Sequence, residues 1–303
     1  MDTLFSARGF AVLVALVVAL FAPGQERDPN LPADYEASLA AMSAAFAGGA
    51  LELEDGTKLA WHIRDGDGPN LVLIPGSWGD YLSFNRFVPH LDANLRIIII
   101  ELRGHGDSGN HQMGATMADL ADDVMRVVAH LGLDRYYLGG HSIGGMLAVE
   151  IAGRAPEGLA GAIPMEGWTH HTVQFNAFGH LGPFPSTPAV AAERAANRDR
   201  GQARLTPEEI RDFASIWRKW DGYEALLATS TPMLQLWGDR GQKERPGRAM
   251  MQIPDRENIQ IFWIPNASHA HLVEQPEAGA QAVNAFIRSV EAQAAAGAPA
   301  ESP

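Results

Sequence analysis

Residues 136–153 read YYLGGHSIGGMLAVEIAG, and this stretch decides the fold. Its first three residues fit a buried strand, and residues 143–153 carry apolar side chains at helical spacing. Between them lies Gly140-His141-Ser142-Ile143-Gly144, a G-x-S-x-G pattern at a turn from strand to helix. Such patterns also arise by chance in glycine-rich chains, but here a strand precedes the motif and a helix follows it, as a catalytic serine at such a turn requires. Glycines at both ends permit a strained turn that exposes a serine hydroxyl, so Ser142 is the candidate nucleophile.

Apolar runs on both sides of this stretch predict a sheet. Short runs that fit buried strands occupy residues 71–74, 95–100, 136–138, 159–165, 233–237 and 259–264. Helical patterns at residues 117–131, 143–153 and 276–291 separate or follow them. A hairpin turning at Asp55-Gly56 comes before the first run. Because strands alternate with helices, we expect an α/β fold with a mostly parallel sheet covered by helices on both faces.

One connection is much longer than a simple crossover needs. About sixty residues separate Met165 from Met233, which indicates an inserted cap or lid. Inside it, Thr206-Pro207-Glu208-Glu209 combines a capping threonine, a first-turn proline and a reciprocal glutamate, and so predicts a helix through Trp217. We expect a cap over residues 168–228, a core over residues 49–167 and 229–293, a helical extension over residues 25–48 and a disordered tail over residues 294–303.

The N-terminus carries an apolar leader. Arg8 precedes an uninterrupted apolar stretch at residues 9–22, which is short for a membrane span and apolar on every side. This pattern predicts a secretory signal over residues 1–24, with cleavage after Gly24, or an uncleaved N-terminal anchor. We therefore expect an exported protein, periplasmic or secreted, whose only attachment to a membrane would be that anchor.

The composition excludes several classes of function. The chain is 46% hydrophobic and 19% charged, as expected for a globular protein. Its net charge of -13 disfavours nucleic-acid or anionic-lipid partners, because both need clustered lysine and arginine. The absence of cysteine excludes disulfides, thiolate metal sites and a cysteine nucleophile. Nothing in the sequence indicates a metal or another cofactor, and we expect none.

From about Leu51 to Val290 the chain resembles the α/β-hydrolase family. The resemblance implies a mostly parallel eight-stranded sheet flanked by helices, with a small helical cap. The segment PGSWG at residues 75–79 stands where that family has a His-Gly loop, although the histidine is absent. It implies an oxyanion hole formed by the N–H groups of Ser77 and Ile143. The segment ELRGHGDS at residues 101–108 resembles a structural turn of the family, so we interpret His105 and Asp107 as turn-stabilising.

The same resemblance assigns a general base and an acid. His269 follows the last predicted strand and precedes the terminal helix, as the family's catalytic histidine does, and therefore ranks above His271. The family's usual acid would follow the seventh strand, where this chain offers only Asp239. Glu166 follows the preceding strand, where some dehalogenases that resemble this chain carry their acid. We expect Glu166 to be the acid, with Asp239 as the alternative.

These residues predict a serine hydrolase that cleaves esters or lactones through an acyl-enzyme on Ser142. Serine at the turn argues against dehalogenase and epoxide-hydrolase chemistry, in which the relatives use aspartate. Four aromatic residues of the cap predict an apolar wall and small hydrophobic substrates: Trp168, Phe175, Phe178 and Phe184. Two alternatives stay open, a carbon–carbon bond hydrolase with the same three residues and a non-catalytic binding protein on the same fold.

Overall fold

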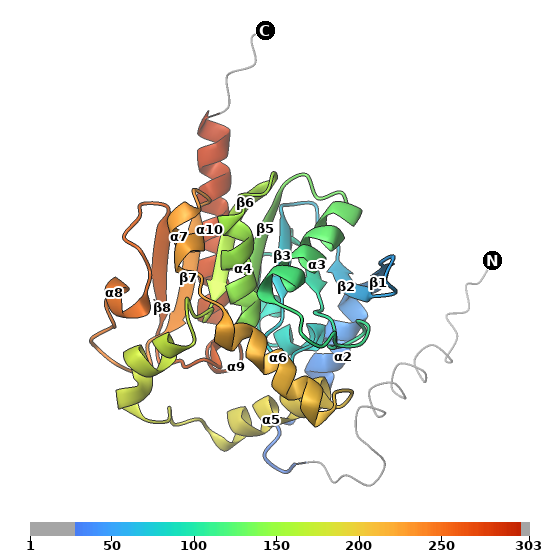
Figure 1. The fold of residues 1–303 in the computed structure, drawn as a ribbon. Helices are drawn as coiled ribbons and strands as arrows, with labels where there is room; N and C mark the ends of the chain where they lie inside the picture. The colour runs from blue at the N-terminus through green and yellow to red at the C-terminus, as the bar shows by residue number, and fades with distance from the viewer. Residues whose placement is uncertain (1–27, 298–303) are drawn as a thin grey trace, which may run out of the picture.

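Eight strands form one sheet, in the order β1-β2-β4-β3-β5-β6-β7-β8 (Figure 1). The computed structural model describes residues 28–297. The strands are β1 (Ala47–Glu52), β2 (Lys58–Arg64), β3 (Asn70–Ile74), β4 (Arg96–Ile100), β5 (Tyr136–His141), β6 (Leu159–Met165), β7 (Met233–Gly238) and β8 (Ile259–Ile264). Strand β2 is antiparallel to both neighbours, and all other pairs are parallel. The predicted mostly parallel, eight-stranded sheet is confirmed.

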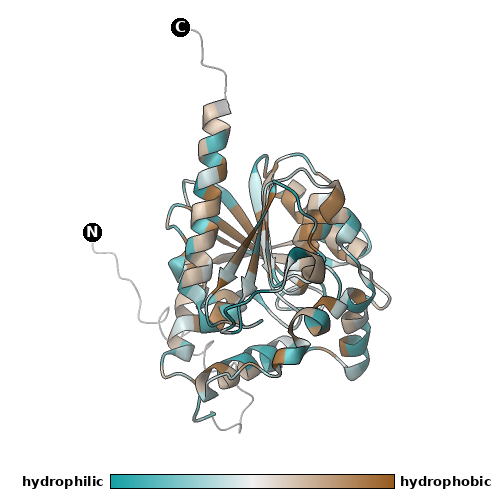
Figure 2. Ribbon diagram, turned by 90° about the vertical axis from the view of Figure 1, so that its left-hand side faces the viewer, coloured by the Kyte–Doolittle hydropathy of each residue, from teal (hydrophilic) through white to brown (hydrophobic). Residues whose placement is uncertain are grey.

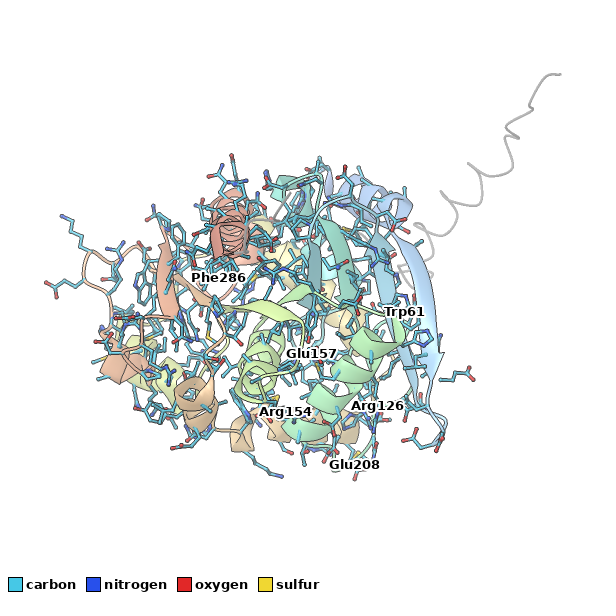
Figure 3. The ribbon with its side chains drawn as sticks, turned by 90° about the horizontal axis from the view of Figure 1, so that it is seen from above. Trp61, Arg126, Arg154, Glu157, Glu208 and Phe286 are labelled. Carbon is cyan, nitrogen blue, oxygen red and sulfur yellow. The ribbon has the colours of Figure 1, made fainter. Side chains whose placement is uncertain are left out.

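Helices cover both faces of this sheet (Figure 2). Helices α3 (Met117–His130), α4 (Ile143–Gly153) and α7 (Tyr223–Ala228) pack on one face, and α2 (Tyr35–Ala45) and α10 (Pro276–Gly297) on the other. Seen end-on, Phe286 of α10 lies across the sheet from Arg126 of α3 (Figure 3). Successive strand residues point to opposite faces, so Val72 joins one hydrophobic core and Leu73 the other.

Two boundaries differ from the predicted ones. The helical extension, expected to reach residue 48, ends at Ala45, and Gly48 and Gly49 belong to β1. Pairing with His62 and Trp61 of β2 provides the ladder that overrides their low strand propensity. At the other end, α10 continues to Gly297, into the segment expected to be disordered. That segment is alanine-rich, and alanine has the highest helix propensity, so the helix propagates beyond the core.

Except for its last helix, the long insertion lies below the sheet in Figure 1, at the edge where the parallel strands end. It holds η3 (Gln174–Phe178), η4 (Gly179–Leu181), α5 (Pro188–Gln202), α6 (Pro207–Lys219) and α7. Helix α6 begins with the predicted capping box, in which Thr206 and Glu209 bond each other's backbone N–H. Helix α7 falls within the predicted cap but packs against α4 of the core.

The predicted leader at residues 1–24 lies outside the described residues. Along residues 28–297, no helix combines the length and the apolar character that a membrane span requires.

Candidate active site

The turn between β5 and α4 places Ser142 in a strained conformation. Its backbone angles are φ 57° and ψ -118°, in a region that side-chain-bearing residues rarely adopt. The turn is tight because α4 begins against β3: a Cβ on Gly144 would lie 2.2 Å from the carbonyl oxygen of Ile74. Backbone strain of this kind costs energy and persists at functional sites where the surrounding structure enforces it. The local geometry is that of a nucleophile elbow.

Ser142 opens into a cavity of about 550 Å³ between the sheet edge and the cap. Ser77 and His269 line the same cavity. The loop after β3 lies beside the serine, since a Cβ on Gly76 would come within 3.2 Å of the Ser142 Cβ. Ile143 is the first residue of α4, and an N–H at that position has no partner within its helix. The structure thus places Ser142, Ser77 and His269 on one cavity, and Ile143 directly follows Ser142 at the start of α4.

Glu166 lies behind His269, away from the cavity. Its Oε2 is 3.4 Å from His269 Nδ1, and its side chain is fully buried. It binds Arg240 more closely, through two contacts of 2.8 Å, and accepts the Gly238 N–H at 2.7 Å. Burial alone would raise the pKa of the Glu166 carboxyl, but the charge of Arg240 and the neighbouring His269 lower that pKa below its usual range. Glu166 is therefore ionised when it faces the imidazole.

Asp239 has a different set of contacts. Its Oδ1 accepts the N–H groups of Gly241 and Asn266, at 2.8 and 2.7 Å. Its Oδ2 binds Arg245 at 2.8 Å. These side-chain contacts tie the loop after β7 to the loop after β8. Of the two candidate acids, Glu166 is the one that the fold places against His269.

The match to known families agrees with this geometry. Residues 71–282 match the family model described as "Alpha/beta hydrolase family", which covers most of the chain. The chain belongs to the α/β-hydrolase family. A solved structure with this fold is a thermophilic esterase from Thermogutta terrifontis, 27% identical, with a TM-score of 0.61 over 80% of this chain and 99% of that one.

Two curated relatives match parts of this α/β-hydrolase. A putative esterase/lipase of Haemophilus influenzae is 31% identical over 48% of this chain and 48% of its own. The dihydrolipoyllysine-residue acetyltransferase component of the acetoin cleaving system of Pseudomonas putida is 34% identical over 35% of this chain and 29% of its own. The chain thus spans half or less of the length of these relatives.

The aromatic wall of the cavity is built largely from other residues than predicted: Trp78, Phe84 and Trp217 line it beside Trp168. Trp168 lines it and stacks on the His269 ring at 5.5 Å, with 17° between the planes. Phe178 is buried against Trp168 and Trp237, behind the wall. Phe175 is 66% exposed, and Phe184 does not line the cavity, so including these two was wrong. The irregular η3 segment turns Phe175 to solvent and Gln174 inward, which helical or strand periodicity cannot predict.

Two other histidines stand near the base in this hydrolase. His141 Nε2 lies 2.6 Å from the carbonyl oxygen of His269, so Nε2 carries the hydrogen and donates it. Burial, followed by the neighbouring His269 and His271, holds the pKa of His141 well below its usual value. Burial also lowers the pKa of His271 to about 4. Both stay neutral at neutral pH and fill the space around His269.

Along the described residues, one group has spacing that could hold a metal ion: His62, Glu101 and Asp107. None of the three lines the cavity of Ser142. The Glu101 carboxylate accepts the backbone N–H groups of Tyr81 and Asp107, at 2.9 and 2.6 Å, and so orders the turn after β4. His105 Nδ1 is hydrogen-bonded to the Arg103 carbonyl oxygen within that turn, which is consistent with a structural role.

Arg240 is the site residue that sequence reasoning missed. Its two contacts with Glu166 and its position over the Phe178 ring, 3.8 Å from the centroid, place it directly behind the acid. A signal was available: a buried carboxylate at the end of β6 requires a cationic partner, and Arg240 follows the adjacent strand β7.

Proposed function

We propose that this α/β-hydrolase is an exported serine hydrolase that cleaves carboxylic esters or lactones through an acyl-enzyme on Ser142. The observation that carries the proposal is the convergence at one cavity of a strained serine, a histidine and a buried carboxylate behind that histidine. Nucleophilic catalysis by serine needs a base within reach and a group that orients the base.

The proton transfers follow from which nitrogen faces the acid. Glu166 is ionised and can only accept, so His269 Nδ1 carries a hydrogen and Nε2 is the basic nitrogen. Nε2 takes the Ser142 proton as the oxygen attacks the ester carbonyl. The N–H groups of Ile143 and Ser77 stabilise the oxyanion. The imidazolium then protonates the departing alcohol, and a water, deprotonated by the same nitrogen, attacks the acyl-enzyme and releases the acid and Ser142.

The substrate is small and partly apolar. A cavity of about 550 Å³ accommodates a compact molecule, and Trp168, Met146, Leu272 and Val273 contribute apolar wall. A curated relative named as a putative esterase/lipase supports ester cleavage. Export is proposed on the leader alone, because Arg8 and the apolar stretch at residues 9–22 have the length and order of a secretory signal.

An ester and lactone panel tests the activity. The purified protein is assayed against 4-nitrophenyl esters of increasing acyl length and against small lactones, beside Ser142→Ala. We expect turnover of short esters that falls at least a thousandfold in Ser142→Ala, with unchanged circular dichroism. Wild-type activity in folded Ser142→Ala would exclude the proposed nucleophile. The mass of the mature N-terminus after expression in a Gram-negative host tests export: a cytoplasmic product still beginning at Met1 would contradict it.

A further inference from the structure

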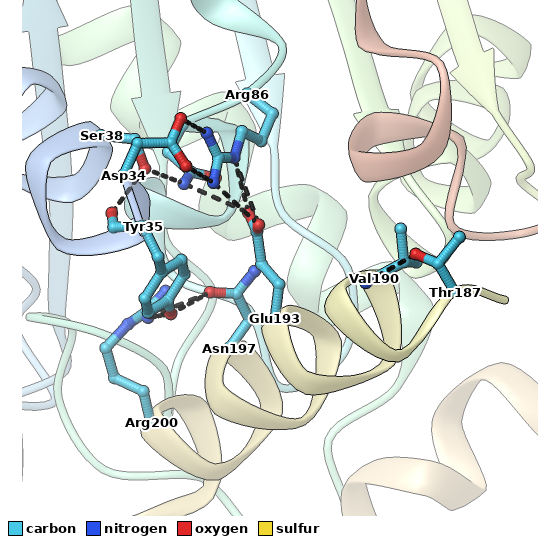
Figure 4. A network of polar contacts seen from close by, with 10 residues as sticks. Asp34, Tyr35, Ser38, Arg86, Thr187, Val190, Glu193, Asn197 and Arg200 are labelled. Atoms are coloured by element: carbon cyan, nitrogen blue, oxygen red, sulfur yellow. Dashed lines mark hydrogen bonds and ion pairs between the residues drawn. The ribbon is translucent and has the colours of Figure 1, made fainter. Parts of the chain in front are cut away.

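Helix α5 of the cap is fixed to the core by ion pairs along one face (Figure 4). Arg200 binds Asp80 through contacts of 2.5 and 2.8 Å, and both side chains are nearly buried. About two turns earlier, the buried Glu193 accepts from Arg86 at 3.0 Å. Asn197, between them, accepts from the Tyr35 hydroxyl at 2.8 Å. Because these contacts repeat along α5, they set its rotation over the cavity as well as its position.

That rotation turns two other arginines of α5 toward the cavity. Arg194 and Arg198 are four residues apart, so they share one face of α5, and both line the cavity of Ser142. Among the residues that the structure describes, Arg194 has no hydrogen-bond or ion-pair partner. Arg198 has only Asp199, at 3.5 Å and largely in solvent, where an ion pair contributes little. Both guanidinium groups thus keep their donors available to a ligand.

The charge of the cavity is opposite to that of the protein. The chain carries a net charge of -13, yet no aspartate or glutamate is among the described residues that line the cavity. Its ionised lining side chains are the two arginines. A guanidinium presents its donors in a planar fork that matches the oxygens of a carboxylate or a phosphate. Two such groups lining one small cavity supply the donors that an anion requires.

We propose that Arg194 and Arg198 bind an anionic group of the substrate, a carboxylate or a phosphate, while its ester carbonyl lies at Ser142. The inference rests on the proposed function, and it defines the substrate class as an ester with one anionic end and an apolar stretch between that end and the scissile bond. Trp168 and Met146 line the same cavity and supply apolar surface for that stretch.

Matched esters measure the preference for the anion. The wild type is assayed with mono-4-nitrophenyl glutarate, with its neutral methyl ester and with the 4-nitrophenyl ester of 4-phosphonobutanoate. We expect kcat/KM for the better anionic ester to exceed that for the neutral one at least tenfold, and the better of the two identifies the anion. Arg194→Gln and Arg198→Gln should each lower this ratio, and the double variant should bring it to about one. Added salt should lower it in the wild type.

Arg211→Gln is the matched control. Arg211 is exposed on α6 of the same cap and does not line the cavity, so its loss removes one cation and should leave the ratio at the wild-type value. A double variant that keeps the wild-type ratio would overturn the proposal, and so would a wild type that prefers the neutral ester.

A binding measurement separates this proposal from the proposed function. Glutarate and inorganic phosphate are titrated calorimetrically into full-length Ser142→Ala, with and without the double substitution at Arg194 and Arg198. We expect binding of at least one anion, lost in the double variant. If no ester is hydrolysed while this binding holds, the proposed function fails and the anion site stands. If esters are hydrolysed but neither anion binds, the anion site is wrong and the hydrolase stands.

Discussion

Two carboxylates at the ends of neighbouring strands have unlike surroundings. Glu166 follows β6 and Asp239 follows β7, and each binds an arginine. The Glu166 side chain is fully buried and reaches His269. The Asp239 carboxylate instead accepts one backbone N–H from its own loop and one from the loop after β8. The direction of the side chain therefore decides which carboxylate at this edge of the sheet orients the histidine. A place after the seventh strand does not decide it.

The backbone contributes to this difference. Glu166 has φ 51°, in the left-handed region, and its N–H donates to the Leu236 carbonyl at 2.9 Å. A glutamate in that region is strained, and such strain is typical of functional positions. Asp239 is not among the residues with positive φ, and its side-chain contacts with the turn are those expected of a structural aspartate.

The largest effect is expected from Glu166→Gln. An amide has the shape of the carboxylate, but it cannot stabilise the imidazolium and can present a donor to Nδ1, which favours the wrong tautomer. We expect kcat to fall about a thousandfold. Because the substitution also leaves Arg240 buried without its anion, the folded fraction must be measured beside the rate. The double variant Glu166→Gln/Arg240→Gln removes that charge, and full activity in it would contradict the role of Glu166.

Arg240→Gln should act on stability more than on rate. It leaves the buried Glu166 carboxylate without its cation, and breaking a buried pair in this way costs about 3 kcal/mol in the free energy of unfolding. The orienting carboxylate stays beside His269, so kcat should fall no more than about tenfold. Urea unfolding and ester kinetics on the same preparation check both values. A loss of rate as large as that of Glu166→Gln would mean that Arg240 itself takes part in the reaction.

Asp239→Asn should have the smallest effect. The amide keeps an oxygen for the N–H groups of Gly241 and Asn266 and loses the charged contact with Arg245, which is 38% exposed. We expect about 1 kcal/mol in the free energy of unfolding and no change in kcat beyond about threefold. A thousandfold loss of kcat here, with Glu166→Gln nearly normal, would reverse the comparison between the two strand ends.

The sequence predicted what depends on local pattern. The elbow at Ser142, the strands on either side and the capping box at Thr206 each follow from residues within one turn or one strand. The contact between Glu166 and Arg240 joins residues 74 apart, through two adjacent strands, and no periodicity encodes it. The direction of Phe175 depended on an irregular segment. Side chains that meet across elements are therefore where the sequence prediction was incomplete.

A fluorophosphonate probe tests the central claim most directly, because it reacts with a serine only when that serine is activated. The protein is incubated with the probe, its intact mass is measured, and the modified peptide is sequenced. We expect one adduct per chain, located at Ser142, with labelling strongly slowed in His269→Ala. Folded wild-type protein that takes up no probe, or an adduct at another serine, would contradict it.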